Sequence, residues 1–354
     1  MAEIATPVRT HSATDMGPDY VCSAPPAFGV PSEVAEGIHW LRMPLPFALD
    51  HINLWMLEDQ PGWTLVDTGL CIDEVKAHWD RVFADRIGGD PVRRVIATHF
   101  HPDHFGLAGW LCERGGAPLW MTRNEWLTAA FLYHDSEGRA AAAQADLFLR
   151  NGLDRERGAA IAARGNRYRR IISSPPPFRR LRDAERFSAG AHEWEVVVGT
   201  GHAPEHACLY CATPGVLIAG DQVLPKISPN VALWATEPEG NPLADFLRSL
   251  DRLRALPRDT LVLPSHGLPF RGLHARIDAL VAHHAERLDL LRGFCAQPRS
   301  AADALPVLFK RELDLHQLLF AMGESLAHLA YLAADGSVRR RRDDDGVTRY
   351  TARC

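Results

Sequence analysis

Short apolar runs, each bounded by charged, glycine or proline residues, recur along the first 270 residues of the chain. Runs of this length and setting are typical of buried strands. We predict strands at 38–43, 51–57, 63–67, 94–98, 117–121, 194–198, 206–212, 216–219 and 261–263. Apolar positions three and four residues apart predict helices at 74–84, 105–113, 243–256 and 272–294. The chain therefore combines buried strands with amphipathic helices.

Three segments depart from this pattern. The first 35 residues are rich in proline, which predicts an extended N-terminal arm at 1–35 lying on the surface. Helical spacing and arginine dominate about 125–186, and we interpret this stretch as an insertion covering the mouth of a site. Helices predicted at 301–312 and 315–332 precede two short strands about an Asp-Gly turn. This order predicts a winged-helix-like domain at 297–354, which leaves 36–296 as the main domain.

Composition indicates which partners and which cellular compartment to expect. It has 354 residues, a formal net charge of −5 and seven scattered cysteines. The acidic balance argues against a dedicated nucleic-acid binder. The cysteine pattern, with no signal peptide and no membrane-length apolar run, predicts a cytoplasmic protein. We interpret the lone Cys208-x-x-Cys211 as core packing rather than as a zinc or redox motif.

Candidate chemistry is concentrated in residues 98–104, Thr-His-Phe-His-Pro-Asp-His, directly after a predicted strand. Neutral imidazole nitrogens and carboxylate oxygens are ligands that divalent metals prefer. Side chains two residues apart on an extended segment point the same way, so His99 and His101 could bind one ion. Asp103 and His104 lie past the bend at Pro102 and would then face a second ion.

Further ligand-type residues follow later strands at glycine or proline turns: His202, Asp221 and His266. Because the same strand-to-turn arrangement delivers each one, we expect them to join the same site. Asp67 ends another apolar run, and it either caps its turn or orients a ligand histidine. His206, which begins the strand after His202, is a second candidate for such a supporting role.

In the order and spacing of these residues, the chain resembles the metallo-β-lactamase-fold hydrolases along about residues 36–290. Gly220-Asp221-x-x-Leu224 with 227–230 is similar to the glyoxalase II-like and LACTB2-like branch, in which a winged-helix tail is common. The resemblance implies an α+β fold, a four-layer αββα sandwich with two metals on one edge. By resemblance, seven residues bind them: His99, His101 and His202 at one ion, Asp103, His104 and His266 at the other, and Asp221 between the two.

The resemblance also implies the chemistry. Two Zn²⁺ ions, with Fe or Mn as alternatives, would hold a bridging hydroxide that attacks an ester, a thioester such as an acyl-CoA, or a lactone. Asp103 could assist proton transfer. The stretch 200–206 departs from the glyoxalase II pattern and no basic glutathione-binding segment is evident, so glutathione thioesters are not expected. Our candidates for substrate contact are Trp126, Tyr133, Lys226 and Asn230.

Two other functions stay open at this point. The first is a metal-dependent RNA-processing endonuclease, since two metals also suit phosphodiester chemistry. The second is an iron-dependent redox enzyme on the same fold. We expect a small acyl substrate, with arginines of the insertion available to bind an anionic group. We expect no nucleic-acid partner and no membrane association, and the apolar C-terminal helices could supply a homodimer interface.

Overall fold

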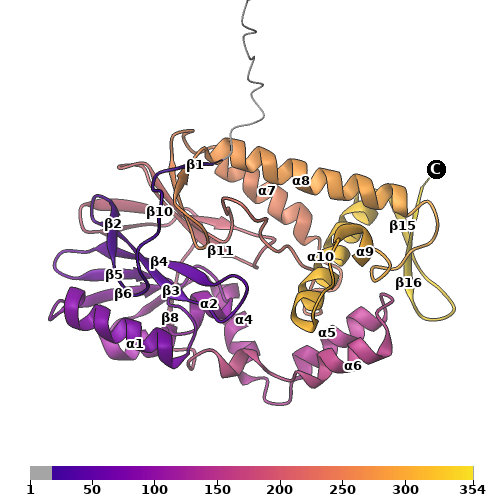
Figure 1. Ribbon diagram of the computed structural model, residues 1–354, viewed down its shortest axis with the longest axis horizontal. Coiled ribbons are helices and arrows are strands. Elements are labelled where there is room, and N and C mark those ends of the chain that lie inside the picture. Colours follow the sequence, from indigo (N-terminus) through magenta and orange to yellow (C-terminus); the bar gives the residue numbers. More distant parts are fainter. Residues whose placement is uncertain (1–17, 354) are drawn as a thin grey trace, which may run out of the picture.

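Two seven-stranded sheets form the centre of the computed structural model, which describes residues 18–353 (Figure 1). The N-terminal sheet contains β2 (Ser32–Ala35), β3 (Ile38–Pro44), β4 (His51–Glu58), β5 (Trp63–Val66), β6 (Val92–Ile96), β7 (Leu119–Met121) and β8 (Phe178–Arg180), side by side in that order. The C-terminal sheet contains β1 (Asp19–Tyr20), β9 (Arg186–Ala189), β10 (His192–Gly199), β11 (His206–Cys211), β12 (Val216–Gly220), β13 (Leu261–Pro264) and β14 (Phe270–Arg271). Its spatial order is β1-β14-β13-β12-β11-β10-β9.

The sheets pack against each other through one shared apolar core. Trp40 and Trp55 of the N-terminal sheet meet Trp194 of the C-terminal sheet there, and all three are buried. Alternate residues of the same strands, such as Leu41 and Leu54, point to the opposite face and meet helices instead. Burial on both faces explains why these strands read as continuous apolar runs.

Helices cover the outer face of each sheet, which confirms the predicted four-layer sandwich. The N-terminal sheet is covered by α1 (Asp73–Val82), α3 (Ala108–Gly115) and α4 (Arg123–His134), with a short turn of helix at Phe83–Ile87. The C-terminal sheet is covered by α7 (Pro242–Leu253) and α8 (Leu273–Phe294). All predicted strands are present, and each ends within two residues of its predicted bounds.

The remaining helices gather beside the sandwich, on the right of Figure 1. They are α5 (Arg139–Leu149), α6 (Arg155–Ala163), α9 (Leu305–Leu308) and α10 (Leu315–Ala334), and they share one core with α7 and α8. The segment 125–186 is therefore divided: α4 packs on the N-terminal sheet, α5 and α6 pack with the C-terminal helices, and β8 belongs to a sheet. A 3-10 turn, Tyr168–Arg170, links the two parts.

The C-terminal segment ends in the predicted hairpin, formed by β15 (Val338–Arg342) and β16 (Thr348–Ala352). The helix predicted at 301–312 is wrong over most of its length, since only Leu305–Leu308 is helical. Ser300 and Asp303 each accept a hydrogen bond from the backbone N–H of the other, which holds a turn instead. Phe309 is extended, which ends α9. The winged-helix assignment stays a prediction.

The N-terminal arm differs from the expected surface segment. Within its described part, β1 pairs with β14 and β2 pairs with β3, so the arm adds an edge strand to each sheet. Residues 1–17 of the predicted arm lie outside the described residues. None of the helices within residues 18–353 is both long and apolar enough to cross a membrane.

Candidate metal centre

The predicted ligands lie where strands end at one edge of the sandwich. In the C-terminal sheet, β12 and β13 are parallel, and β10 runs in the same direction because β11 is antiparallel to both β10 and β12. Their carboxyl ends therefore share one edge, and they deliver His202, Asp221 and His266 to it. In the N-terminal sheet, β6 leads to His99 and His101. Asp103 and His104 lie on a single turn of helix, α2 (Pro102–Phe105).

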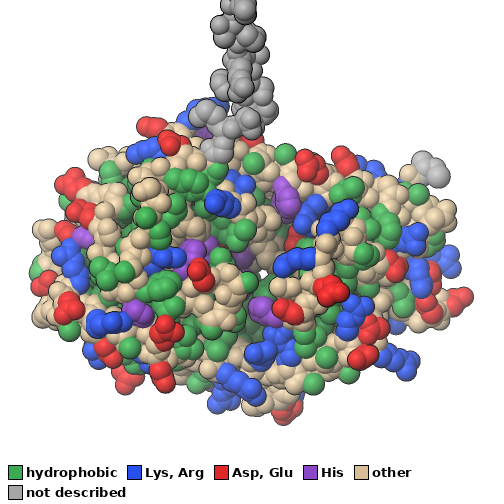
Figure 2. All heavy atoms as spheres, viewed as in Figure 1, with side chains coloured by type: hydrophobic (Ala, Val, Ile, Leu, Met, Phe, Trp, Pro, Cys, Tyr) green, Lys and Arg blue, Asp and Glu red, His purple; other side chains and the backbone are tan. Residues whose placement is uncertain are grey.

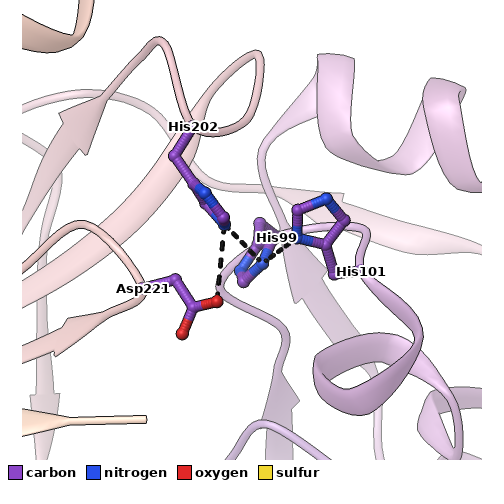
Figure 3. Close-up of side chains that lie close together, drawn as sticks. All are labelled: His99, His101, His202 and Asp221. Atoms are coloured by element: carbon purple, nitrogen blue, oxygen red, sulfur yellow. Dashed lines mark hydrogen bonds and ion pairs between the residues drawn. The ribbon is translucent and has the colours of Figure 1, made fainter. Parts of the chain in front are cut away.

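The first group of side chains is His99, His101, His202 and Asp221, whose ligand atoms all lie within 4.8 Å of one another. In Figure 3 these side chains point toward one another from two different parts of the chain. The distance from His99 Nε2 to His101 Nδ1 is 2.9 Å, and from His99 Nε2 to His202 Nε2 it is 3.4 Å. Asp221 Oδ2 lies 3.4 Å from His202 Nε2.

The second group is Asp103, His104 and His266. His266 Nε2 lies 3.4 Å from Asp103 Oδ2 and also 3.4 Å from Asp221 Oδ1. His104 Nε2 lies 3.5 Å from the same Asp221 oxygen. Asp221 therefore turns one carboxylate oxygen to each group. This is the arrangement expected of a ligand shared between two ions.

Two atoms of this site test whether a metal fits. His104 Nε2 and Asp221 Oδ1 are buried and have no hydrogen-bond partner among residues 18–353. Buried polar atoms normally have a partner, and leaving one without it costs about 1–3 kcal/mol. Both atoms face the centre of the cluster, where a divalent cation would coordinate them. The donor set of imidazoles and carboxylates is also one that Zn²⁺ accepts.

The charges in the site point to a bound cation. Burial lowers the pKa of His101 to about 3, and it lowers the pKa of His99 well below its usual range. Both rings are therefore neutral at neutral pH, as metal ligands must be. Although burial opposes it, Asp221 and Asp103 raise the pKa of His266 to about 10. Carboxylates that hold a proton on a buried imidazole would also hold a divalent ion in its place.

Asp67 contacts the second group through His104. Its Oδ2 accepts hydrogen bonds from His104 Nδ1 at 2.8 Å and from the Thr98 hydroxyl at 2.9 Å. Its Oδ1 accepts from the Thr98 backbone N–H at 2.7 Å. Of the two alternatives for Asp67, these contacts favour orientation of a ligand histidine. A hydrogen bond at Nδ1 fixes the tautomer and turns His104 Nε2 toward the site.

His202 and His266 are oriented in the same way by backbone carbonyls. His202 Nδ1–H donates to the Asn230 carbonyl at 2.8 Å, and His266 Nδ1–H donates to the His51 carbonyl at 2.8 Å. His206 contacts two of the predicted ligands. Its Nε2 accepts a hydrogen bond from the Asp221 backbone N–H at 3.1 Å. Its ring stacks on His99 with centroids 4.8 Å apart.

Gly220 shows how tightly the Asp221 turn is packed. Its φ of +53° lies in the left-handed region, which side chains other than glycine rarely adopt. A Cβ atom at this position would lie only 2.3 Å from His206 Nε2. A glycine is therefore required where β12 delivers Asp221.

Glu125 is a buried residue that the sequence analysis did not connect with the site. One carboxylate oxygen accepts from the Phe100 N–H at 2.9 Å and the other from the Glu205 N–H at 2.6 Å. It therefore joins the 98–104 loop to the loop after His202. Burial raises the pKa of Glu125 to about 8, although both N–H donors favour the charged form. The sequence signal, Thr122-x-x-Glu125, is that of a helix capping box and gives no hint of this contact.

The predicted substrate residues have varied surroundings. The Trp126 indole donates to the Pro176 carbonyl at 2.8 Å, and its ring stacks on Phe178. Tyr133 is half-buried against the N-terminal helices. Lys226 is exposed, with Nζ 5.9 Å from the centre of the Tyr20 ring. Among these four, Asn230 contacts a predicted metal ligand, through the carbonyl that holds His202. Their role toward substrate stays a prediction.

The Cys208-x-x-Cys211 pair behaves as predicted. Both residues are free and buried. Cys208 faces the helices outside the C-terminal sheet, while Cys211 lies in the core between the sheets. Neither belongs to the two groups of ligand-type side chains described above.

Comparison with known proteins agrees with this fold and site. The solved structure of a beta-lactamase domain protein from Burkholderia ambifaria has 47% sequence identity and a TM-score of 0.88, covering 95% of this chain and 98% of that one. The metallo-beta-lactamase family protein TTHA1429 from Thermus thermophilus has 34% identity and a TM-score of 0.77, covering 91% and 100%. The probable metallo-hydrolase YqjP of Bacillus subtilis (strain 168) is 26% identical over 315 residues, 86% of this chain and 94% of its own length.

Two family descriptions match successive parts of the chain. Residues 288–353 match the metallo-beta-lactamase-like C-terminal domain. Residues 48–266, which include all seven predicted ligands, match the metallo-beta-lactamase superfamily. With the sandwich, the ligand-bearing edge and two similar solved structures in agreement, this chain belongs to the metallo-beta-lactamase superfamily and carries a candidate metal site of its hydrolases.

Proposed function

We propose that this protein is a dinuclear zinc hydrolase that cleaves an ester, a thioester or a lactone of a small acyl substrate. The observation that carries the proposal is Asp221, whose two oxygens face two separate groups of histidines. A buried carboxylate with one oxygen toward each group is suited to hold two ions close together. Two such ions, when bound, would activate water and polarise a carbonyl oxygen.

The chain's own residues would hold and orient the reacting groups. His202 and His266 are fixed by backbone carbonyls, so their Nε2 atoms need little rearrangement on loading. Although burial opposes it, His104 and His266 hold the pKa of Asp103 below its usual value. The side chain of Asp103 is 20% exposed, compared with 11% for Asp221. Asp103 is therefore the better placed of the two carboxylates to accept a proton from water.

The substrate proposal draws on the surroundings of this edge. Figure 2 shows a hollow near the centre of one face, bordered by histidine and basic side chains. Phe47, four residues before His51, is 47% exposed and stacks on His316 of α10 at 5.8 Å. Arg164 of the insertion donates to the Leu315 carbonyl and to His316 Nδ1. An acyl group could pack on the aromatic rings while a basic side chain binds an anionic group.

A hydrolysis panel tests this function. Protein loaded with zinc, and the same protein after chelation, would be assayed against an acyl-CoA, a lactone, a p-nitrophenyl ester, a β-lactam, a phosphodiester and single-stranded RNA. We expect turnover of at least one acyl substrate that chelation abolishes and zinc restores. His101→Ala and Asp221→Ala should lower that turnover to background, because each removes a ligand.

The matched control is His134→Ala, which removes an exposed histidine at the end of α4 and should keep wild-type activity. Circular dichroism and thermal melting would verify that all three variants fold. Metal-dependent cleavage of RNA with no acyl hydrolysis would refute the acyl assignment and favour a nuclease. Stoichiometric iron in protein purified without added metal would refute zinc.

A further inference from the structure

A segment that follows α6 lies along the loop that carries four of the predicted ligands. It spans residues 168–174, begins with the 3-10 turn, and is called the strap below. The Ile171 carbonyl accepts a hydrogen bond from the Cys71 N–H at 3.0 Å, and the Ser173 N–H donates to the Gly106 carbonyl at 2.6 Å. The strap is therefore joined to the N-terminal half of the sandwich through its backbone.

The far end of the strap is fixed beyond the last ligand of that loop. Ser173 Oγ donates to the Gly106 carbonyl at 2.9 Å and accepts from the Gly109 N–H at 3.0 Å. A Cβ atom at Gly109 would lie 2.2 Å from the Ser174 carbonyl oxygen, so the strap and α3 are in close contact. Close packing and hydrogen bonds at this end leave the strap little room to shift.

Tyr168, at the other end of the strap, makes the contact nearest to the metal ligands. Its hydroxyl donates to the Phe100 carbonyl at 2.5 Å. Phe100 lies between His99 and His101, whose rings have centroids 4.6 Å apart and which Figure 3 shows together. The Phe100 N–H is held as well, because it donates to Glu125 at 2.9 Å. Both polar backbone groups between the two ligands are thus bonded to side chains of the segment 125–186.

The Tyr168 hydroxyl keeps its proton at neutral pH. Burial raises the pKa of this hydroxyl well above its usual range, and the carboxylates of Glu125 and Asp103 raise it further. A protonated hydroxyl can donate to a carbonyl, whereas a phenolate can only accept. The hydrogen bond to Phe100 is therefore available under the conditions of a metal titration.

We propose that Tyr168 is a positioning residue for the ion at the first group of ligands, acting through the Phe100 carbonyl. This inference rests on the proposed function, since it assumes that this group binds a metal. Without the hydroxyl, the backbone between the two histidines of the loop is held on one side only. The ion at the second group is supported separately, because Asp67 orients His104.

Tyr168→Phe tests this proposal, because it removes the hydroxyl and keeps the ring. Zinc affinity would be measured by competition with a chromophoric chelator, so the result does not rely on activity. Groups that orient a metal ligand typically change metal affinity by about 10- to 100-fold. We expect Tyr168→Phe to lower the affinity for one of the two ions by about that factor and to leave the other affinity unchanged. The absorption spectrum of the cobalt-loaded variant should change as well.

Two matched variants separate positioning from a general loss of stability. Ser173→Ala removes a hydroxyl from the same strap. It should lower the melting temperature of the chelated protein and leave the zinc affinity and the cobalt spectrum as in wild type. Tyr331→Phe removes a half-buried hydroxyl from α10, which packs in the other helical core, and should leave affinity and spectrum unchanged. A loss of affinity in Ser173→Ala equal to that in Tyr168→Phe would overturn the inference.

A double variant identifies which ion depends on Tyr168. Asp67→Asn should lower the affinity for the ion at His104, so the combination with Tyr168→Phe should weaken both ions, each by the factor of the single variant. A combination that weakens only one ion, wild-type affinity for both ions in Tyr168→Phe, or failure of that variant to fold would also overturn the inference. A wild-type protein that binds no metal would instead refute the proposed function itself.

Discussion

Removal of Glu125 should loosen the link between the two loops that carry His99, His101 and His202. Its two oxygens accept the backbone N–H groups of Phe100 and Glu205. Glu125→Ala leaves both donors buried without a partner, at a cost of about 1–3 kcal/mol each. The two lost hydrogen bonds should therefore cost about 2–6 kcal/mol, a large fraction of the roughly 5–15 kcal/mol that stabilises a typical domain.

Glu125→Gln is the matched variant for this measurement. It keeps the size of the side chain but offers one acceptor oxygen and one amide, so its free energy of unfolding should be about 1–3 kcal/mol higher than that of Glu125→Ala. Urea unfolding of the chelated proteins at pH 7 would give both free energies. The two variants are compared with each other, because neither carries the carboxylate whose pKa burial raises to about 8, and the wild type also loses stability by burying that charge. Chelation keeps metal binding out of the comparison.

Glu156→Ala, an exposed change in the first turn of α6, serves as the reference and should stay within about 0.5 kcal/mol of wild type. Equal free energies of unfolding for Glu125→Ala and Glu125→Gln would refute the reasoning, since they would mean that the two N–H groups do not depend on this acceptor. A zinc titration of the same variants should show weaker binding at His99, because Phe100 lies between two ligands.

Two further predictions concern other polar groups. Asp67→Asn should lower the affinity for the ion at His104 by about 10- to 100-fold in a chelator competition and leave the affinity for the other ion unchanged. An equal loss of affinity for both ions would contradict the view that Asp67 orients only the second group. Burial lowers the pKa of His284 to about 3, so the unfolded chain binds a proton below pH 6.5 that the folded chain does not, and stability falls as pH decreases toward 3. Between pH 7 and pH 5 this group should lower the free energy of unfolding by about 2 kcal/mol. In urea unfolding of the chelated proteins, the decrease between these two pH values should be about 2 kcal/mol smaller for His284→Leu than for wild type. The same decrease in both proteins would contradict this assignment.

The sequence predicted the fold and the candidate ligands far better than the contacts that hold those ligands in place. Strands such as β12 and β13 are buried on both faces, so their apolar runs identify them directly. The ligands follow those strands at turns, which made their convergence predictable. The short strands β1, β2, β8, β9 and β14 have too few buried positions to give such a pattern.

Contacts between distant segments were not predictable from local patterns. Glu125 of α4 and Glu324 of α10 are both buried, although a glutamate on a helix is ordinarily a cap or a solvated residue. Their burial follows from which helix packs against which loop, and no periodicity encodes that choice. The Arg-rich stretch 125–186 was similarly misleading in part, because α5 and α6 pack with the C-terminal helices while only α4 covers the N-terminal sheet.

The division of the site between two sheets has a consequence for the lifetime of the protein. His99, His101, Asp103 and His104 come from one sheet, and His202, Asp221 and His266 come from the other, so an ion that binds both sets favours the closed sandwich. An ion present at about 1,000 times its dissociation constant stabilises the folded state by about 4 kcal/mol. Metal-starved molecules would open more often and be degraded sooner by proteases. Metal supply would then control the abundance of the protein as well as its activity.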